Sequence, residues 1–322
     1  MAKSASIENR LAEVAALADS VESPDTRKQL RKHLGSKASP IVARAAQIVA
    51  KIESHDFAPD LVQAFNRFLI DPIKTDKGCM AKCAVVKALL AANSEDEELF
   101  RKGVKHVQLE PTWGGRADTA APLRALCGLG LVQVGARDAM DELATLLADK
   151  EPDARIGAAS ALGYCGLSAT PLLRFKVLTG DEESAVLAEC LSSLMKIAPA
   201  DSVSFVGNFV DPEYPSLYEH AALTLAESRL SGIFELLRDK WTTTFDREFK
   251  KTLLLPMALT RCEEAKDFMI SIIEDGEIAM ATAAINALRI FGGDETLRSR
   301  LESAIEGPNK TQLLALVRRD SD

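Results

Sequence analysis

The segment HVQLEPTWGGRADT, residues 106–119, contains side chains whose types suit the binding of a partner. Protein interfaces most often depend on Trp and Arg, and Trp113 and Arg116 lie three positions apart in this segment. His106 and Glu110 add two polar side chains that a turn between helices does not require. We therefore expect Trp113, Arg116, Glu110 and His106 to be binding residues.

The rest of this segment predicts a loop between two helices. A helix over 97–108 must end near Pro111, because a proline keeps the residue before it away from helical geometry. Gly114 and Gly115 can adopt a positive φ without steric cost, which allows a tight reversal of the chain. The loop is thus explained by its backbone, while its large and charged side chains are not.

Two roles are open for those side chains. Asp118 or Thr119 would cap the helix that follows the loop. Trp113 could fold back as a wedge between neighbouring helices, with Arg116 paired to Glu110 or Asp118. Alternatively, Trp113 and Arg116 could face a ligand or partner, since loops on rigid scaffolds commonly carry binding residues.

A second candidate surface is basic and lies near the N-terminus. Four cations in the segment 25–37 are spaced four apart in two pairs, which places them along one flank of a predicted helix: Arg27, Lys28, Arg31 and Lys32. An acidic or phosphate-bearing partner could dock on this stripe. It could also be a solvated outer face, or it could pair with an acidic surface of another copy of the chain.

The distribution of charge argues against a general nucleic-acid binder. Residues 1–120 hold 18 basic and 16 acidic side chains, and 39 − 18 = 21 basic and 47 − 16 = 31 acidic ones follow. The net charge is therefore +2 in the first part and −10 in the second. Because nucleic-acid affinity comes largely from neutralising phosphates, we expect a protein partner, with self-association as a further option.

The sequence also predicts a cytoplasmic protein without a membrane span. The start, MAKSASIENR, lacks the apolar core of a secretory signal. No apolar run approaches the roughly 20 residues that cross a bilayer. Six cysteines in 322 residues are too sparse for a disulfide framework and fit a reducing compartment.

We find no sequence pattern that predicts a metal site, a cofactor or a catalytic centre. Cys79 and Cys83 share a helix face, but no CxxC, HExxH or histidine cluster accompanies them. Cysteines within Ala-rich helices are expected to be core residues. The sequence also has no GxSxG, Walker or GxGxxG pattern in the required context. No cofactor and no catalytic residue are therefore predicted.

The framework that positions these residues is an internal repeat of helix pairs. Ala-rich segments such as 81–91, 153–166 and 281–293 recur, and the leucines that end them are 29 to 37 residues apart. A second amphipathic segment precedes each one, as 139–149 does. Because one pair cannot bury its apolar face alone, neighbouring pairs must share a core. We predict about eight antiparallel pairs in a single all-α solenoid over 1–322, with an N-terminal cap at about 1–22 and a C-terminal capping helix and tail at about 308–322.

The repeats resemble the HEAT family of α-helical repeats. The segment PDARIGAASALG (152–163) is similar to the second helix of such a repeat, with Pro152, Asp153 and Arg155 in the family's positions. The resemblance implies a right-handed superhelix of the HEAT/armadillo type, in which Asp153 and Arg155 brace adjacent repeats. The repeat at 242–261 departs from the pattern because Pro256 lies inside its helix, where a kink or early break is expected.

The resemblance implies a function less specifically than a fold. HEAT-like proteins are protein-binding scaffolds and, less often, enzymes, so we expect a non-catalytic scaffold or adaptor. Bilin lyases and related chromophore chaperones are an alternative of similar repeat style. Alkylpurine DNA glycosylases of this architecture use Trp, Asp and Arg, which Trp113, Asp118 and Arg116 supply within one loop. HEAT-like deoxyhypusine hydroxylases need repeated His-Glu dipeptides, and this chain has none.

Overall fold

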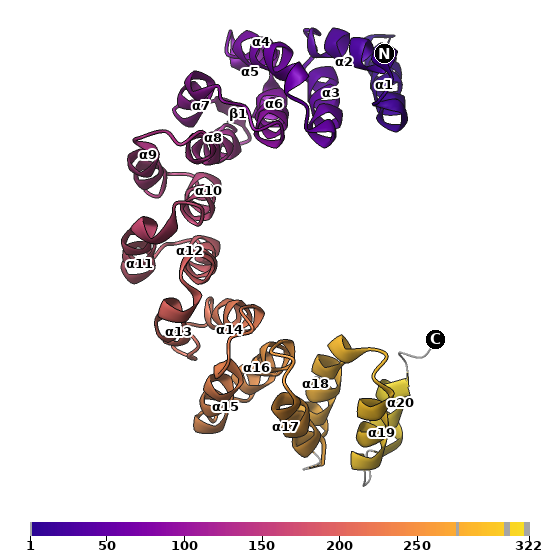
Figure 1. The fold of residues 1–322 in the computed structure, drawn as a ribbon, viewed down its shortest axis with the longest axis vertical. Helices are drawn as coiled ribbons and strands as arrows, with labels where there is room; N and C mark the ends of the chain where they lie inside the picture. The colour runs from indigo at the N-terminus through magenta and orange to yellow at the C-terminus, as the bar shows by residue number, and fades with distance from the viewer. Residues whose placement is uncertain (1, 275–276, 306–309, 319–322) are drawn as a thin grey trace. The chain divides into compact units, whose positions relative to one another are not determined.

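The computed structural model describes residues 2–274, 277–305 and 310–318. The chain divides into two compact units, unit 1 over Met1–Leu172 and unit 2 over Leu173–Asp322. Each unit consists of helices packed against neighbouring helices, and the described residues contain one two-stranded β-sheet, in unit 1 (Figure 1). The structure is thus mostly helical, with many contacts between neighbouring helices, as the alternating helical pattern of the sequence predicts.

Among the described residues, unit 1 begins with α1 (Ala2–Ala16) and continues through nine further α-helices, short 3-10 turns and one hairpin. The elements after α1 are η1 (Leu17–Ser20), α2 (Pro24–Leu34), α3 (Ser39–Ile52), η2 (His55–Phe57), α4 (Ala58–Phe68), α5 (Pro72–Thr75), η3 (Lys77–Cys79), α6 (Met80–Ala91), α7 (Glu97–Val104), β1 (Leu109–Thr112), β2 (Gly115–Asp118), α8 (Ala121–Gln133), α9 (Ala139–Leu146), α10 (Pro152–Leu162) and η4 (Gly166–Ala169). Helix α11 (Thr170–Thr179) crosses the boundary to unit 2.

The helices of unit 1 form two layers. Helices α3, α6, α8 and α10 lie side by side in one layer, and α2, α4, α7 and α9 pack against them in the other (Figure 1). Small residues allow close approach: a Cβ on Gly157 of α10 would lie 2.1 Å from the Cβ of Ala125 in α8. A Cβ on Gly130 would likewise lie 2.4 Å from the ring of Phe100. The Ala- and Gly-rich helices are thus the ones that pack most tightly.

Unit 2 has the same alternation of helices. Helices α12, α14, α16, α18 and α20 contact one another in sequence, and α13, α15, α17 and α19 pack beside them. Their bounds are α12 (Ser184–Ile197), α13 (Pro199–Gly207), α14 (Tyr218–Glu227), α15 (Ile233–Thr243), α16 (Arg247–Leu259), α17 (Glu263–Glu274), α18 (Ile278–Leu288), η5 (Arg289–Phe291), α19 (Glu295–Ala304) and α20 (Lys310–Arg318).

Three local expectations are corrected by the structure. The helix predicted over 97–108 ends at Val104, and the segment after it forms a β-hairpin instead of an irregular loop. The break predicted at Pro256 does not occur, because α16 continues to Leu259. A proline near the C-terminal end of a helix removes one backbone hydrogen bond without ending the helix. The predicted C-terminal tail beyond Arg318 lies outside the described residues.

Candidate functional site

The hairpin β1–β2 reverses direction through the shortest common type of loop. Its strands are antiparallel, with Thr112 opposite Gly115, so that only Trp113 and Gly114 form the turn. Gly114 has φ +93°, a value that side-chain-bearing residues rarely adopt. The two glycines are therefore not equivalent: Gly114 alone has the positive φ that the turn requires.

The turn leaves Trp113 in solvent. Its relative exposure is 105%, so no described residue covers the indole. Val107 and Leu109, at the base of the hairpin, are also exposed large apolar residues. The wedge role considered for Trp113 is therefore wrong for this chain, because a wedge between helices would be buried.

Glu110 has the opposite environment, being only 4% exposed. Its carboxylate accepts hydrogen bonds from the Gly78 backbone N–H at 2.6 Å, from Gln108 Nε2 at 2.6 Å and from Thr119 Oγ1 at 3.0 Å. Burial would raise the pKa of Glu110, but these hydrogen bonds outweigh it and hold the pKa below its ordinary value. Glu110 thus joins the hairpin to the turn before α6 and does not face outward.

Asp118 holds the other end of the hairpin. Its carboxylate accepts hydrogen bonds from the backbone N–H groups of Gln108 at 3.0 Å and Ala120 at 2.9 Å. It also forms a buried ion pair of 2.6 Å with Arg124 of α8. Burial opposes ionisation, yet these contacts keep the pKa of Asp118 below its ordinary value.

Neither residue predicted to cap α8 does so. Ala120 is the residue before the helix, and no side chain caps it. Thr119 donates its hydroxyl to Glu110 and to the carbonyl of Gln108 instead. Thr119 thus stabilises the hairpin, whereas Asp118 joins the hairpin to the start of α8 through Ala120 and Arg124 without being the N-cap residue.

Arg124 connects the hairpin to the following repeat. Its guanidinium makes two hydrogen bonds to the carboxylate of Asp149, at 2.8 and 2.9 Å, in addition to its contact with Asp118. It also donates to the backbone carbonyl of His106 at 3.0 Å. A planar, bidentate contact of this kind fixes orientation as well as distance.

An equivalent buried pair supports the hairpin from α6. Asp76 and Lys82 have 0% exposed side chains and are joined at 2.9 Å. The Asp76 carboxylate also accepts from the backbone N–H groups of Ala81 and Lys82, while its carbonyl accepts from Gln108 Nε2 at 2.8 Å. The polar groups beneath the hairpin therefore form one connected network.

A spacing in the sequence accompanies this network but does not identify it, because the same spacing occurs at Glu110 and Arg116, which make no ion pair with each other. An acidic residue six positions before a basic one occurs at Asp76/Lys82, at Asp118/Arg124 and again at Asp149/Arg155. In the third case Arg155 donates to the backbone carbonyls of Asp149 and Lys150, at 2.8 and 3.0 Å. The bracing assigned to Asp153 is thus made by Asp149, and Asp153 is exposed.

The two remaining predicted residues of the segment differ in environment. Arg116 is exposed and makes no ion pair with any described residue, so the predicted pairing with Glu110 or Asp118 is wrong. His106 is half-buried, with Nε2 3.3 Å from Gln108 Oε1, and burial lowers its pKa below the ordinary value. Trp113 and Arg116 therefore face solvent, whereas Glu110 and His106 belong to the support.

The predicted basic stripe is divided by intramolecular ion pairs. Arg27 pairs with Asp56 at 3.1 Å, and Arg31 pairs with Asp60 at 2.8 Å, so both arginines connect α2 to the helix pair that follows. Lys28 and Lys32 are exposed and have no ion pair among the described residues. Only half of the stripe is thus available to another molecule.

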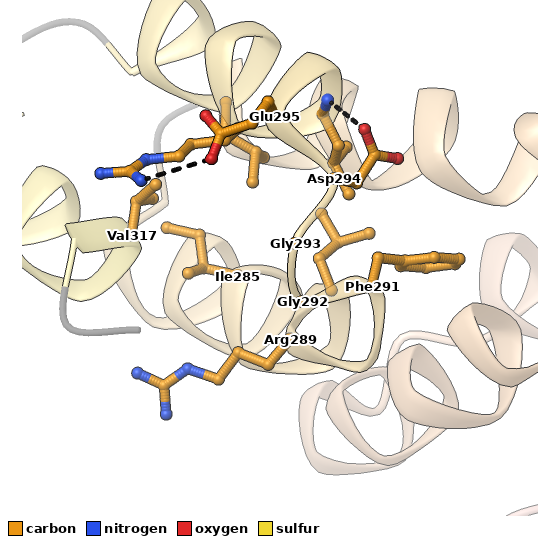
Figure 2. A pocket seen from close by; sticks show the side chains of 12 residues that line it. Ile285, Arg289, Phe291, Gly292, Gly293, Asp294, Glu295 and Val317 are labelled. Atoms are coloured by element: carbon orange, nitrogen blue, oxygen red, sulfur yellow. Dashed lines mark hydrogen bonds and ion pairs between the residues drawn. The ribbon is translucent and has the colours of Figure 1, made fainter. Parts of the chain in front are cut away.

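The cysteines and a cavity in unit 2 were also considered as possible sites. Contact with Cys83 and burial raise the pKa of Cys79, and burial, with a further contribution from Cys83, raises the pKa of Cys127. Among the described residues no group of three or more His, Cys, Asp or Glu side chains could hold a metal ion. A cavity of about 310 Å³ in unit 2 lies beside η5 and α19 (Figure 2), and its Asp294 is engaged by Leu297 N and Lys266.

Comparisons with known proteins do not assign the chain to a family. No protein-family model matches it, and no curated protein is similar to it in sequence. It is similar to an engineered protein solved by the Northeast Structural Genomics Consortium, at 17% identity and a TM-score of 0.34, over 98% of this chain and 94% of that one. Similarity at that TM-score assigns neither fold nor function. In the described part of the chain, no helix is long and apolar enough to span a membrane.

Proposed function

We propose that this chain is a non-catalytic protein-interaction module whose main anchor is Trp113. The observation that carries the proposal is a fully exposed indole at the tip of a hairpin whose base is held by buried hydrogen bonds and ion pairs. Arg116, which is exposed on the adjacent strand and makes no ion pair with a described residue, is the second anchor. Trp and Arg on a rigid support are the typical energetic centre of a protein interface.

The energetics favour a partner that encloses the indole. A Trp side chain buries about 150–250 Å², which at about 25 cal/mol per Å² corresponds to at most ~4–6 kcal/mol. The network of Glu110, Asp118 and Arg124 already orders the backbone that presents Trp113. Binding therefore loses less conformational entropy than it would on a mobile loop.

Apolar residues around the base of the hairpin extend the proposed contact. Val107 and Leu109 flank the hairpin, and Ile73 and Met80 lie on the α5–α6 segment to which Gln108 and Glu110 bind. All four are exposed. An apolar centre with a charged margin matches the composition of the buried part of protein interfaces.

The proposal is tested by affinity capture with three baits: wild type, Trp113→Ala and Phe245→Ala. Phe245 is the matched control because it is a 99% exposed aromatic residue in unit 2. A partner identified with the wild type is then purified and its affinity measured by titration. We expect Trp113→Ala to weaken binding at least tenfold, which is about 1.4 kcal/mol, and Phe245→Ala to leave it unchanged.

The thermal midpoint separates binding from folding. Substituting an exposed side chain changes stability by about 0.5 kcal/mol or less, whereas deleting a buried Trp costs about 3–5 kcal/mol. We expect Trp113→Ala to have the same thermal midpoint as the wild type. Equal affinity of the wild type and Trp113→Ala for the purified partner would exclude the hairpin as the anchor.

A further inference from the structure

We propose a second interaction surface, separate from the hairpin: the solvent face of α3, α6 and α8 binds an acidic, amphipathic peptide segment of a partner protein. The surface is defined by Arg44, Lys51 and Lys87, with apolar residues between and beside them. It shares Met80 with the apolar residues beside the hairpin but does not depend on Trp113 or Arg116, so that the two proposals can fail independently.

The spacing of exposed residues identifies this face. On α3 the exposed residues Arg44, Gln47 and Lys51 are three and four positions apart, which is one stripe of a helix. On α6 the exposed Met80 and Lys87 are seven apart and lie on one stripe in the same way. The two helices are neighbours in the layer, and their other sides are covered by α2, α4, α1 and α8. The three cations therefore project from one side of the layer.

The charge of this face is of one sign. Helices α3, α6 and α8 contain no Asp or Glu, and none of Arg44, Lys51 and Lys87 makes an ion pair with a described residue. Arg44 donates only to Gln47, at 3.4 Å. The acidic residues closest in sequence, Glu53 and Glu95, follow the C-terminal ends of α3 and α6.

In the other layer of unit 1, by contrast, several arginines have carboxylate partners. There Arg27, Arg31 and Arg101 are neutralised by carboxylates of adjacent helices. Unit 1 as a whole is neutral, with 22 basic and 22 acidic residues, yet its acids lie outside these three helices. The unpaired cations thus create a local positive potential that a partner's carboxylates would complement.

Apolar residues on the same face favour a peptide over a nucleic acid. Met80 is 51% exposed, and on α8 Leu126 and Leu129 are partly exposed. A nucleic-acid surface would need more phosphate-binding cations and aromatic side chains for base stacking. The helices α3, α6 and α8 contain no aromatic residue. Cations interleaved with aliphatic side chains instead match a segment that alternates acidic and aliphatic residues.

The experiment measures fluorescence anisotropy of four labelled probes with the intact chain. The probes are an amphipathic peptide of Leu and Glu, the same peptide with Lys in place of Glu, polyglutamate and a DNA duplex. The chain is tested as wild type, K51E/K87E, Trp113→Ala and the control K28E/K32E, which reverses two exposed and unpaired lysines of the other layer. Each titration is repeated in about 1 M salt, where screening acts within about 3 Å.

We expect the Leu/Glu peptide to bind wild type best and to lose most of its affinity in high salt. K51E/K87E should lower the affinity for the Leu/Glu peptide about tenfold or more. The affinities of K28E/K32E and Trp113→Ala should remain within about twofold of the wild-type affinity. The inference would be overturned if DNA or polyglutamate bound the wild type more tightly than the Leu/Glu peptide. It would also be overturned if K28E/K32E lost as much affinity for that peptide as K51E/K87E. If Trp113→Ala lowers the affinity for the Leu/Glu peptide and K51E/K87E does not, the peptide binds at the hairpin. The proposed function would then stand and this inference would be wrong.

Discussion

The carboxylate of Glu110 and the backbone N–H of Gly78 lie 2.6 Å apart, which joins the first strand of the hairpin to the turn that precedes α6. Thirty-two residues separate the two groups in the chain. Because Glu110 also accepts from Gln108 and Thr119, a single buried side chain connects the turn, the strand and the start of the α8 segment.

Glu110→Ala should destabilise the chain measurably. It leaves the Gly78 N–H without its acceptor and removes one of the two acceptors of Gln108 Nε2 and of the Thr119 hydroxyl, and an unsatisfied buried group costs about 1–3 kcal/mol. Urea unfolding measures the loss. The control is Glu98→Ala, whose carboxylate is exposed and paired only with Lys102, so that its effect should be within about 0.5 kcal/mol. Equal stability of the two variants would show that the Glu110 contacts do not hold the hairpin.

Stability should also fall in acid because of the hairpin. The folded pKa values of Glu110 and Asp118 lie below their ordinary values, so their contributions are present above the unfolded pKa values of about 4.3 and 3.9. These contributions are lost as the pH falls through the lower, folded pKa values. Unfolding free energies measured from neutral pH down to about pH 3 should therefore decrease less steeply in Glu110→Gln than in wild type. If the unfolding free energy fell equally steeply with pH in Glu110→Gln and wild type, other carboxylates would be responsible for the acid sensitivity.

The Asp76–Lys82 pair should behave as a coupled unit. Lys82→Met leaves a fully buried carboxylate without its cation, and breaking a buried pair in this way costs about 3–5 kcal/mol. The double variant D76N/K82M removes both charges and should lose less than the sum of the single losses. Unfolding of the two single variants and the double variant gives the coupling energy. Additive losses would mean that the two side chains are energetically independent.

Gly157→Ala should destabilise the contact between α8 and α10. The added Cβ would lie 2.1 Å from the Ala125 Cβ, so the helices would have to separate, at a cost of about 1–3 kcal/mol. Gly115→Ala is the control, because a Cβ at Gly115 meets no atom within 4 Å and its φ is not positive. Thermal unfolding of both variants measures the difference. A Gly157→Ala midpoint at or above that of wild type would contradict the close packing.

Much of the fold could be predicted because helices depend on local spacing. The apolar repeat of 29 to 37 residues predicted alternating helices, and the structure has them in both units. Gly114 correctly indicated a reversal of the chain, whereas Pro111 did not mark the end of the helix, which ends at Val104. The hairpin itself was not predicted, because its strands are four residues each and contain Pro and Gly, which are rare in strands. It forms because contacts with Gly78, Asp76 and Arg124 fix its base.

The sequence by itself determined the alternation of helices, a tight reversal at the glycine pair 114–115, which the structure shifts by one residue, and the presence of Trp113 and Arg116 within one short segment. These features depend on residue type and on spacing of a few positions. Only the tertiary structure decided which side chains of that segment face solvent. Glu110 is buried and accepts from the Gly78 N–H, 32 residues earlier in the chain, and Trp113 is exposed because no described residue covers it. Contacts between residues distant in sequence decide that Glu110 is buried while Trp113 is exposed. No local pattern in the sequence specifies such contacts.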